Sequence, residues 1–216
     1  MKPVKCYFAG VTVKETKAMD SKPTGSELRD GMPFLGGHLW LDLLNSTPIV
    51  AGAEQDLLAT PDRFARWLAA AGLPQPEKPA EEQARRTLAA LRPRLRTAFD
   101  ELRATGTVSK TAAYAVNLLL AQARVELRLE VAASGAQLVE TFDPGPGGPA
   151  AAVARDFARF AATHAGASAR LKACANPACN MVFFDAGKNA TRRWCSMALC
   201  GNREKIKRYR KRQAEV

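Results

Sequence analysis

The chain has 216 residues, of which 47% are hydrophobic and 25% are charged, and its formal net charge is +11 at pH 7. This composition is typical of a soluble globular protein that forms one large domain or two small ones. There is no run of about 18 apolar residues, which argues against a transmembrane helix and a membrane partner. No cleavage site follows the short apolar stretch near the start, so we expect a cytoplasmic protein without a signal peptide.

The pattern of apolar residues separates an N-terminal extension from a helical domain. Residues 1–33 are rich in Lys, Thr, Ser, Gly and Pro, and we expect an extension there with a short strand at 7–13. The domain begins near Phe34 and continues to residue 165. Its apolar residues recur every three or four positions, which predicts helices over 36–45, 61–71, 81–105, 109–122 and 150–164. Pro93 is expected to kink or divide the third of these helices.

The apolar period changes from helical to alternating within this domain. Val125, Leu127, Leu129 and Val131 alternate with charged residues, and a Ser-Gly turn follows at 134–135. The returning segment, 138–142, is again apolar. This pattern predicts a β-hairpin with one polar face.

Four of the five cysteines lie in the last fifth of the chain and have the spacing of a metal site. They form two identical steps, Cys174-x4-Cys179 and Cys195-x4-Cys200, separated by fifteen residues. Zinc accepts four thiolates in a tetrahedral arrangement. A turn within the first step, strands at 181–184 and 191–194, and a helix capped by Ser196 would bring the four sulfurs together.

Such a site is expected to be structural, because four thiolates close the zinc shell and no His or Glu pair lies nearby to activate water. Ordinary buried cysteines and an iron–sulfur cluster are the alternatives. The predicted fold class is therefore α+β. A mainly helical domain with a β-hairpin, residues 34–165, precedes a small treble-clef-like zinc finger, residues 170–216.

The positive charge is concentrated behind the cysteines. Residues 170–216 contain 12 Lys and Arg against 3 Asp and Glu, whereas the rest of the chain contains 20 against 18. Such a segment attracts polyanions. Within the terminal helix, Leu199, Ile206 and Tyr209 are expected to face the zinc module. The candidate nucleic-acid contacts are Arg192, Arg193, Asn202, Arg203, Lys205, Lys207, Arg208, Arg210, Lys211 and Arg212.

Asn202 has two alternatives, a contact with adenine or a local hydrogen bond near the helix start. The two histidines are His38 and His164. His38 is interpreted as a helix-start residue in or near the core rather than as part of a pocket, and His164 as a partner of the last carbonyls of its helix. The sequence has no nucleophile motif, phosphate loop or dinucleotide fingerprint, so we do not expect an enzyme.

Two segments resemble known families. Cys200-Gly201-Asn202-Arg203 is similar to the motif that names the CGNR zinc finger, and the four cysteines fall where that family has its metal ligands. The segment 34–47, Phe-Leu-Gly-Gly-His-Leu-Trp-Leu-Asp-Leu-Leu-Asn-Ser-Thr, resembles the opening of the ABATE domain that precedes this finger. Together the two resemblances cover about residues 34–212. They imply a bacterial transcription regulator that binds DNA, in some members linked to stress.

Three functions remain open from the sequence. The first is a DNA-binding transcription regulator whose N-terminal domain senses a small-molecule effector or dimerises, with a homodimer expected because regulators commonly match two half-sites. The second is an RNA-binding or ribosome-associated zinc protein, which would use the same charges. The third is an enzyme with an accessory finger, for which the sequence offers no catalytic set.

Overall fold

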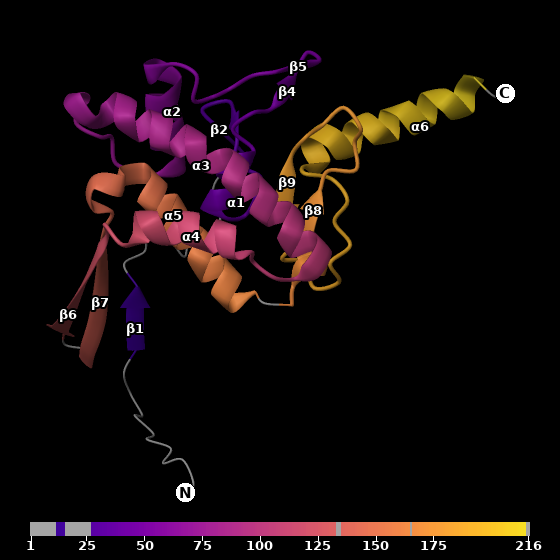
Figure 1. The fold of residues 1–216 in the computed structure, drawn as a ribbon. Coiled ribbons are helices and arrows are strands. Elements are labelled where there is room, and N and C mark those ends of the chain that lie inside the picture. Colours follow the sequence, from indigo (N-terminus) through magenta and orange to yellow (C-terminus); the bar gives the residue numbers. More distant parts are fainter. Residues whose placement is uncertain (1–11, 16–26, 133–134, 165, 215–216) are drawn as a thin grey trace, which may run out of the picture.

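The computed structural model describes residues 12–15, 27–132, 135–164 and 166–214 (Figure 1). The predicted strand at 7–13 lies mostly outside this range, and β1 covers Thr12–Glu15. The helices are α1 Leu39–Leu44, α2 Pro61–Ala71, α3 Lys78–Thr105, α4 Lys110–Leu120, α5 Gly148–Thr163 and α6 Asn202–Ala214. The remaining strands are β2 Leu28–Arg29, β3 Met32–Pro33, β4 Ile49–Val50, β5 Ala53–Glu54, β6 Arg124–Ala132, β7 Gly135–Asp143, β8 Leu171–Ala173 and β9 Val182–Phe184. The mainly helical α+β fold class is confirmed.

The starts of α2 and α4 and the end of α2 fall where capping residues predict. The Thr60 hydroxyl accepts a hydrogen bond from the Arg63 backbone N–H at 3.3 Å, and Ser109 caps α4 in the same way. Gly72 ends α2 with a left-handed φ of 71°, which glycine adopts without strain. Pro93 lies inside α3, and the helix runs unbroken through it for 28 residues, so of the two predicted effects, a kink or a division, the division is wrong.

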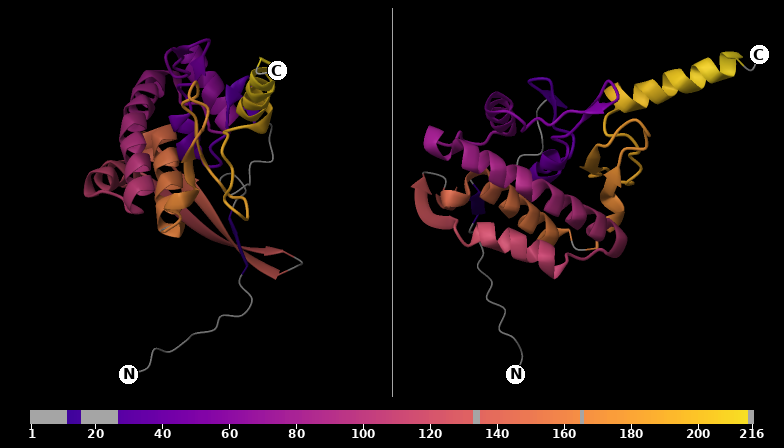
Figure 2. Two further views of the ribbon diagram at one scale, coloured as in Figure 1. Left: turned by 90° about the vertical axis from the view of Figure 1, so that its right-hand side faces the viewer. Right: turned by 45° about the horizontal axis from the view of Figure 1, so that its top comes forward.

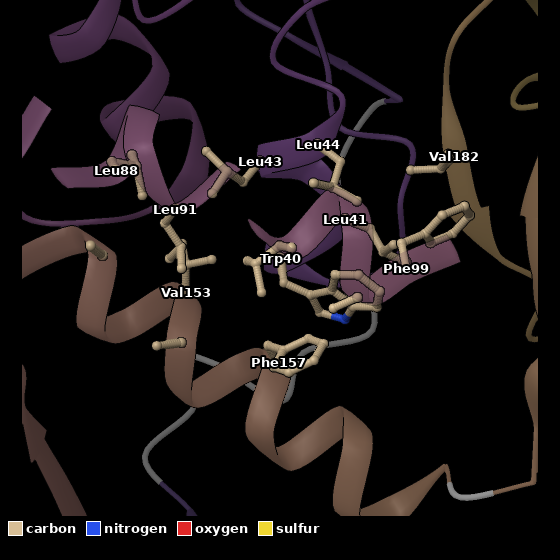
Figure 3. Packing of buried hydrophobic residues seen from close by; sticks show 14 of the residues in the cluster. Trp40, Leu41, Leu43, Leu44, Leu88, Leu91, Phe99, Val153, Phe157 and Val182 are labelled. Atoms are coloured by element: carbon tan, nitrogen blue, oxygen red, sulfur yellow. The ribbon is translucent and has the colours of Figure 1, made fainter. Parts of the chain in front are cut away.

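The core forms around α1, which lies between α3 and α5 (Figure 3). Trp40 is fully buried, and its ring centroid lies 5.2 Å from those of Phe157 and Phe160 on α5. The Trp40 backbone N–H donates to the Asp156 carboxylate at 2.9 Å, so α5 also satisfies an unpaired donor at the start of α1. The short helix α1, near the N-terminal end of the domain, is thus the central helix of its core.

The predicted hairpin is confirmed and is longer than the sequence indicated. β6 and β7 pair antiparallel from Arg124–Asp143 to Ala132–Gly135, and β1 pairs parallel with β7, which gives the order β1-β7-β6. Figure 1 shows this sheet leaving the helical body, with β6 on its outer side. All side chains of β6 from Arg124 to Val131 are exposed.

The segment before Phe34 and the cysteine module both pack on the helical core. β2 and β3 form a small hairpin in which Met32 is buried. β8 and β9 pair antiparallel, and Leu171 and Val182 in these strands belong to the main hydrophobic core. Leu35 joins a second cluster with Phe183 and the cysteines. The finger therefore shares its core with the domain before it. Among the described residues, no helix is both long and apolar enough to cross a membrane.

Candidate metal centre and nucleic-acid interface

The four clustered cysteines converge from three short segments. Cys174 follows β8, Cys179 precedes β9, and Cys195 and Cys200 flank the start of the last helix. All four sulfurs lie within 4.8 Å of one another, and the Cys179–Cys195 and Cys195–Cys200 sulfur pairs are each 3.7 Å apart. Four sulfurs bound tetrahedrally at about 2.3 Å from zinc would be separated by about 3.8 Å. The geometry and the donor set therefore fit a closed four-thiolate zinc site.

Neighbouring groups orient the sulfurs. The Asn176 amide nitrogen lies 3.3 Å from the Cys200 sulfur, and the Cys195 backbone N–H donates to the Cys174 sulfur at 3.4 Å. The Asn176 carbonyl oxygens accept from the backbone N–H groups of Ala178 and Cys179, which closes the turn inside the first cysteine step. Donors aimed at sulfur favour the thiolate form that a metal requires.

The pKa values of the cysteines also indicate that a cation is needed before all four can be thiolates. The hydrogen bond between the Cys179 and Cys195 sulfurs lowers the pKa of Cys179 to about 5 and raises the pKa of Cys195. Burial raises the pKa of Cys200. Adjacent thiolates repel one another, so all four lose their protons together only when a cation balances their charge. Zinc would supply that charge.

Ser196 caps the start of the last helical segment, as predicted. Its hydroxyl oxygen accepts from the Leu199 backbone N–H at 3.2 Å and donates to the Glu27 carboxylate. A π-helical turn, Met197–Gly201, carries Cys200 and continues directly into α6. A metal ligand thus lies in the first turn of the helix that carries the basic residues.

The predicted strand at 191–194 does not form. β9 pairs with β8 upstream instead, and the 191–194 segment is connected to the turn through the Ala175 N–H and the Arg193 carbonyl, 2.9 Å apart. Arg192 contacts the protein interior rather than the outer surface. Its guanidinium lies 4.2 Å from the Phe183 ring centroid and donates to the carbonyl oxygens of Trp194, Cys195 and Leu35. Arg193 is exposed beside the Trp194 ring.

The basic helix projects from the body into solvent (Figures 1 and 2). Ile206 and Tyr209 are 51% and 59% exposed, so the prediction that they face the zinc module is wrong. α6 leaves the finger at an angle that keeps its outer turns away from the β8–β9 hairpin. Asn202, Arg203, Lys205, Lys207, Arg208, Arg210 and Arg212 are all exposed, whereas the Lys211 side chain lies outside the described atoms. Asn202 makes the local bond, to the Ala198 carbonyl at 3.4 Å.

Comparison with protein families covers both parts of the chain. Residues 37–164 match the ABATE family, described as "Putative stress-induced transcription regulator", and residues 170–213 match the CGNR zinc finger. The chain belongs to the ABATE family. The resemblance seen in the sequence is thereby confirmed, with the ABATE domain first and the CGNR finger second. A search of curated proteins finds no match.

Direct hydrogen bonds join the ABATE domain to the CGNR finger. The Asn45 side chain exchanges two bonds with the Val182 backbone, at 2.9 and 2.8 Å. The Phe184 N–H donates to the Gly36 carbonyl, and the Asn180 amide donates to the Thr47 carbonyl. None of these long-range partners could be read from the sequence, although Gly36, Asn45 and Thr47 all lie in the segment that resembles the ABATE opening.

An ion pair fixes the finger loop that follows β9. Asp185 is buried, and its carboxylate accepts from Lys172 at 2.9 Å and from the backbone N–H groups of Arg192 and Gly187. Burial opposes ionisation, but these three donors outweigh it and lower the pKa of Asp185. The ion pair holds the loop that carries Arg192 and Arg193.

A cleft of about 1450 Å³ lies between the ABATE domain and the finger loop. The ABATE side contributes His38, Asp156 and His164, and the finger contributes Arg193 and Trp194. His38 is the N-cap residue of α1 and its ring lies 4.8 Å from that of buried Phe160, so the expected helix-start position near the core is confirmed. Its partly exposed side chain also lines the cleft, 3.9 Å from Asp156. The predicted role of His164 is confirmed by its Nδ1, which lies 3.2 Å from the Phe160 carbonyl oxygen near the end of α5.

Proposed function

We propose that this chain is a DNA-binding transcription regulator that inserts α6 into the major groove. The observation that carries the proposal is the projection of α6, whose described side chains beyond Glu204 are all exposed while Cys200 lies at its base. Its 13 residues span about 20 Å, and the major groove of B-DNA admits a helix. The deep, narrow major groove of A-form RNA does not, which favours DNA over duplex RNA.

The residues of α6 divide into a cationic surface and an uncharged stripe. Asn202, Ile206, Tyr209 and Gln213 follow one another at steps of four, three and four, so they lie along one side of the helix. Lys205 and Arg210 border this stripe on its two sides. Asn and Gln hydrogen-bond adenine edges, and apolar groups contact the thymine methyl. Because Asn202 makes a local bond to the Ala198 carbonyl, we assign base contacts to Ile206, Tyr209 and Gln213 of the stripe and phosphate contacts to the cations around it.

The metal supports this function without chemistry of its own. The four cysteines would hold zinc, and zinc would fix the turn from which α6 projects. We assign no catalytic role to the chain. Arg192 supports the base of the finger rather than the contact surface.

The cleft supports a role for the ABATE domain in sensing an effector. Its walls come from both parts of the chain, so a small molecule bound there would contact the domain and the finger loop together. A metabolite-library thermal-shift screen would test this, with Thr163→Trp, which fills part of the cleft, as the matched variant. A ligand that stabilises the native chain and not the variant is expected, and a ligand that stabilises both equally would place the site elsewhere.

Selection of bound sequences from a random duplex library at near-physiological salt tests the DNA function, with an RNA pool selected in parallel. We expect enrichment of a duplex sequence and affinity that falls steeply with salt. Enrichment in the RNA pool alone would favour the RNA-binding alternative. Absence of enrichment in the duplex pool contradicts the proposal.

A further inference from the structure

The outer strand of the hairpin has the features of an unpaired interface. β6 is nine residues long, and in the described part of the chain no strand pairs with its outer edge. Its apolar residues Leu127, Leu129 and Val131 are 64%, 65% and 83% exposed. Long apolar edge strands promote pairing with another chain, and monomeric proteins usually shorten, bulge or cover them. Within the described residues, β6 keeps a continuous nine-residue register without a bulge, and its side chains from Arg124 to Val131 are exposed.

The charges on β6 select one kind of partner. Arg124, Glu126, Arg128 and Glu130 alternate in sign on the face opposite the apolar residues. Two antiparallel copies centred on Leu127 would place Arg124 opposite Glu130 and Glu126 opposite Arg128, twice each. On the other face, Val125 would meet Leu129 and Leu127 would meet its own copy. A strand whose charges complement themselves fits a second copy of the same strand.

Other registers satisfy fewer of these charges. Centring the pair on Glu126 or Arg128 places like charges opposite each other, as does a parallel in-register pair. Centring on Val125 or Leu129 leaves a single type of opposite-charge pair, Arg124–Glu126 or Arg128–Glu130. A shift by one residue would place apolar residues opposite charged ones. The register centred on Leu127 is thus the one in which all four charged residues find opposite charges.

We propose that β6 is a homodimer interface, in which two copies pair antiparallel about Leu127 and form one six-stranded sheet. The two-fold axis is then perpendicular to the sheet, as it is for antiparallel neighbours. The base of the sheet already contacts the body on its apolar face, where the Arg155 guanidinium lies 4.5 Å from the Phe142 ring centroid and Arg159 bonds Glu140. Both helical bodies therefore lie on the same side of the joined sheet.

The test measures the mass of the zinc-loaded full chain by sedimentation and light scattering across a wide concentration range. We expect the native chain to reach twice its monomer mass of 23.3 kDa. Glu126→Arg alone and Arg128→Glu alone each create two pairs of like charges and should weaken the dimer by about tenfold or more. Because these side chains are exposed, the variants are expected to fold, and circular dichroism checks that they do.

Two combinations distinguish β6 pairing from a general effect of charge. A mixture of the Glu126→Arg and Arg128→Glu variants should form a dimer with one chain of each, because the opposite charges again face each other. The double variant should form a homodimer by itself. Arg94→Glu, an exposed reversal on α3, is the matched control and should leave the dimer unchanged.

Several outcomes would overturn the interface. These are a native chain that stays monomeric at every concentration, a dimer that withstands both single reversals, and a failure of the mixture and the double variant to recover the dimer. The measurement uses no nucleic acid, so its result is independent of whether α6 binds DNA.

Discussion

Asn45 of the ABATE domain and Val182 of the CGNR finger pair through two hydrogen bonds, as neighbouring strands do. The Asn45 amide nitrogen donates to the Val182 carbonyl at 2.9 Å, and its oxygen accepts from the Val182 N–H at 2.8 Å. Asn45 is fully buried and Val182 nearly so. Both bonds are shielded from water, and together with the Gly36–Phe184 and Thr47–Asn180 bonds they join the two halves of the molecule.

Asn45→Ala should therefore destabilise the protein strongly. The substitution leaves the N–H and C=O of Val182 buried without partners, at a cost of about 1–3 kcal/mol for each group. Urea unfolding of the zinc-loaded protein measures the loss, and Asn180→Ala, at a more exposed bond to Thr47, should cost less. A loss below about 1 kcal/mol would mean that the connection is not a main element of stability.

Cys200→Ser should release zinc and also weaken the ABATE domain. Removing one thiolate opens the four-ligand shell, and the second hydrophobic cluster joins Cys200 and Phe183 to Leu35 of the ABATE side. We expect less than one zinc per chain and a lower melting temperature of the whole molecule. Cys6→Ser, which alters a cysteine outside the cluster, is the control. One full equivalent of zinc in the Cys200→Ser protein would rule out this role for Cys200.

Asp42 should make stability depend on pH. Burial raises the pKa of its carboxyl group to about 7, although the Gly36 N–H donates to it at 2.8 Å. The unfolded chain releases this proton near pH 4. Stability is therefore retained at low pH and is lost as the pH rises through 7, on the order of 2 kcal/mol between pH 5 and pH 8.

Asp42→Asn keeps the shape of this side chain and removes the ionisation. The difference in unfolding free energy between native protein and variant should shift by that amount between pH 5 and pH 8. Taking the difference cancels the proton release that accompanies zinc binding. Parallel pH profiles for the two proteins would show that Asp42 does not hold a proton in the folded state.

The two surfaces of α6 should respond differently to substitution. Lys205→Ala and Arg210→Ala remove cations that border the uncharged stripe, so each should weaken all duplexes alike and reduce the salt slope by about one. Gln213→Ala should instead lower the preference for the selected sequence by about 1–3 kcal/mol and leave the slope unchanged. Affinities for selected and scrambled duplexes at several salt concentrations separate these results. A fall in the salt slope on Gln213→Ala would assign that residue to phosphate.

The local features of this fold could be predicted, because their signals are local. Alternation of apolar and charged residues marked the hairpin, the two cysteine steps marked the metal site, and Ser196 marked the helix start. The direction of α6 could not be predicted. Ile206 and Tyr209 have the spacing of a buried face, yet no part of the described chain covers them.

The joining of the two halves was hidden for a different reason. Asn45 and Val182 are 137 residues apart, and neither residue type signals a partner. Arg192 is likewise one of many cations in the sequence. Its stacking on Phe183 and its bonds to three carbonyls depend on a loop that Asp185 positions through Lys172. Pairing between distant segments decides which cations remain available to a ligand.

The hairpin and α6 lie on opposite sides of the body in Figure 1, the hairpin at the lower left and α6 at the upper right. A dimer joined through β6 would hold its two α6 helices at the outer ends of an elongated particle. The two α6 helices of such a dimer would then be poorly placed to enter adjacent turns of one duplex. If α6 binds DNA as proposed, such a dimer would present its two DNA-binding helices to separate stretches of duplex.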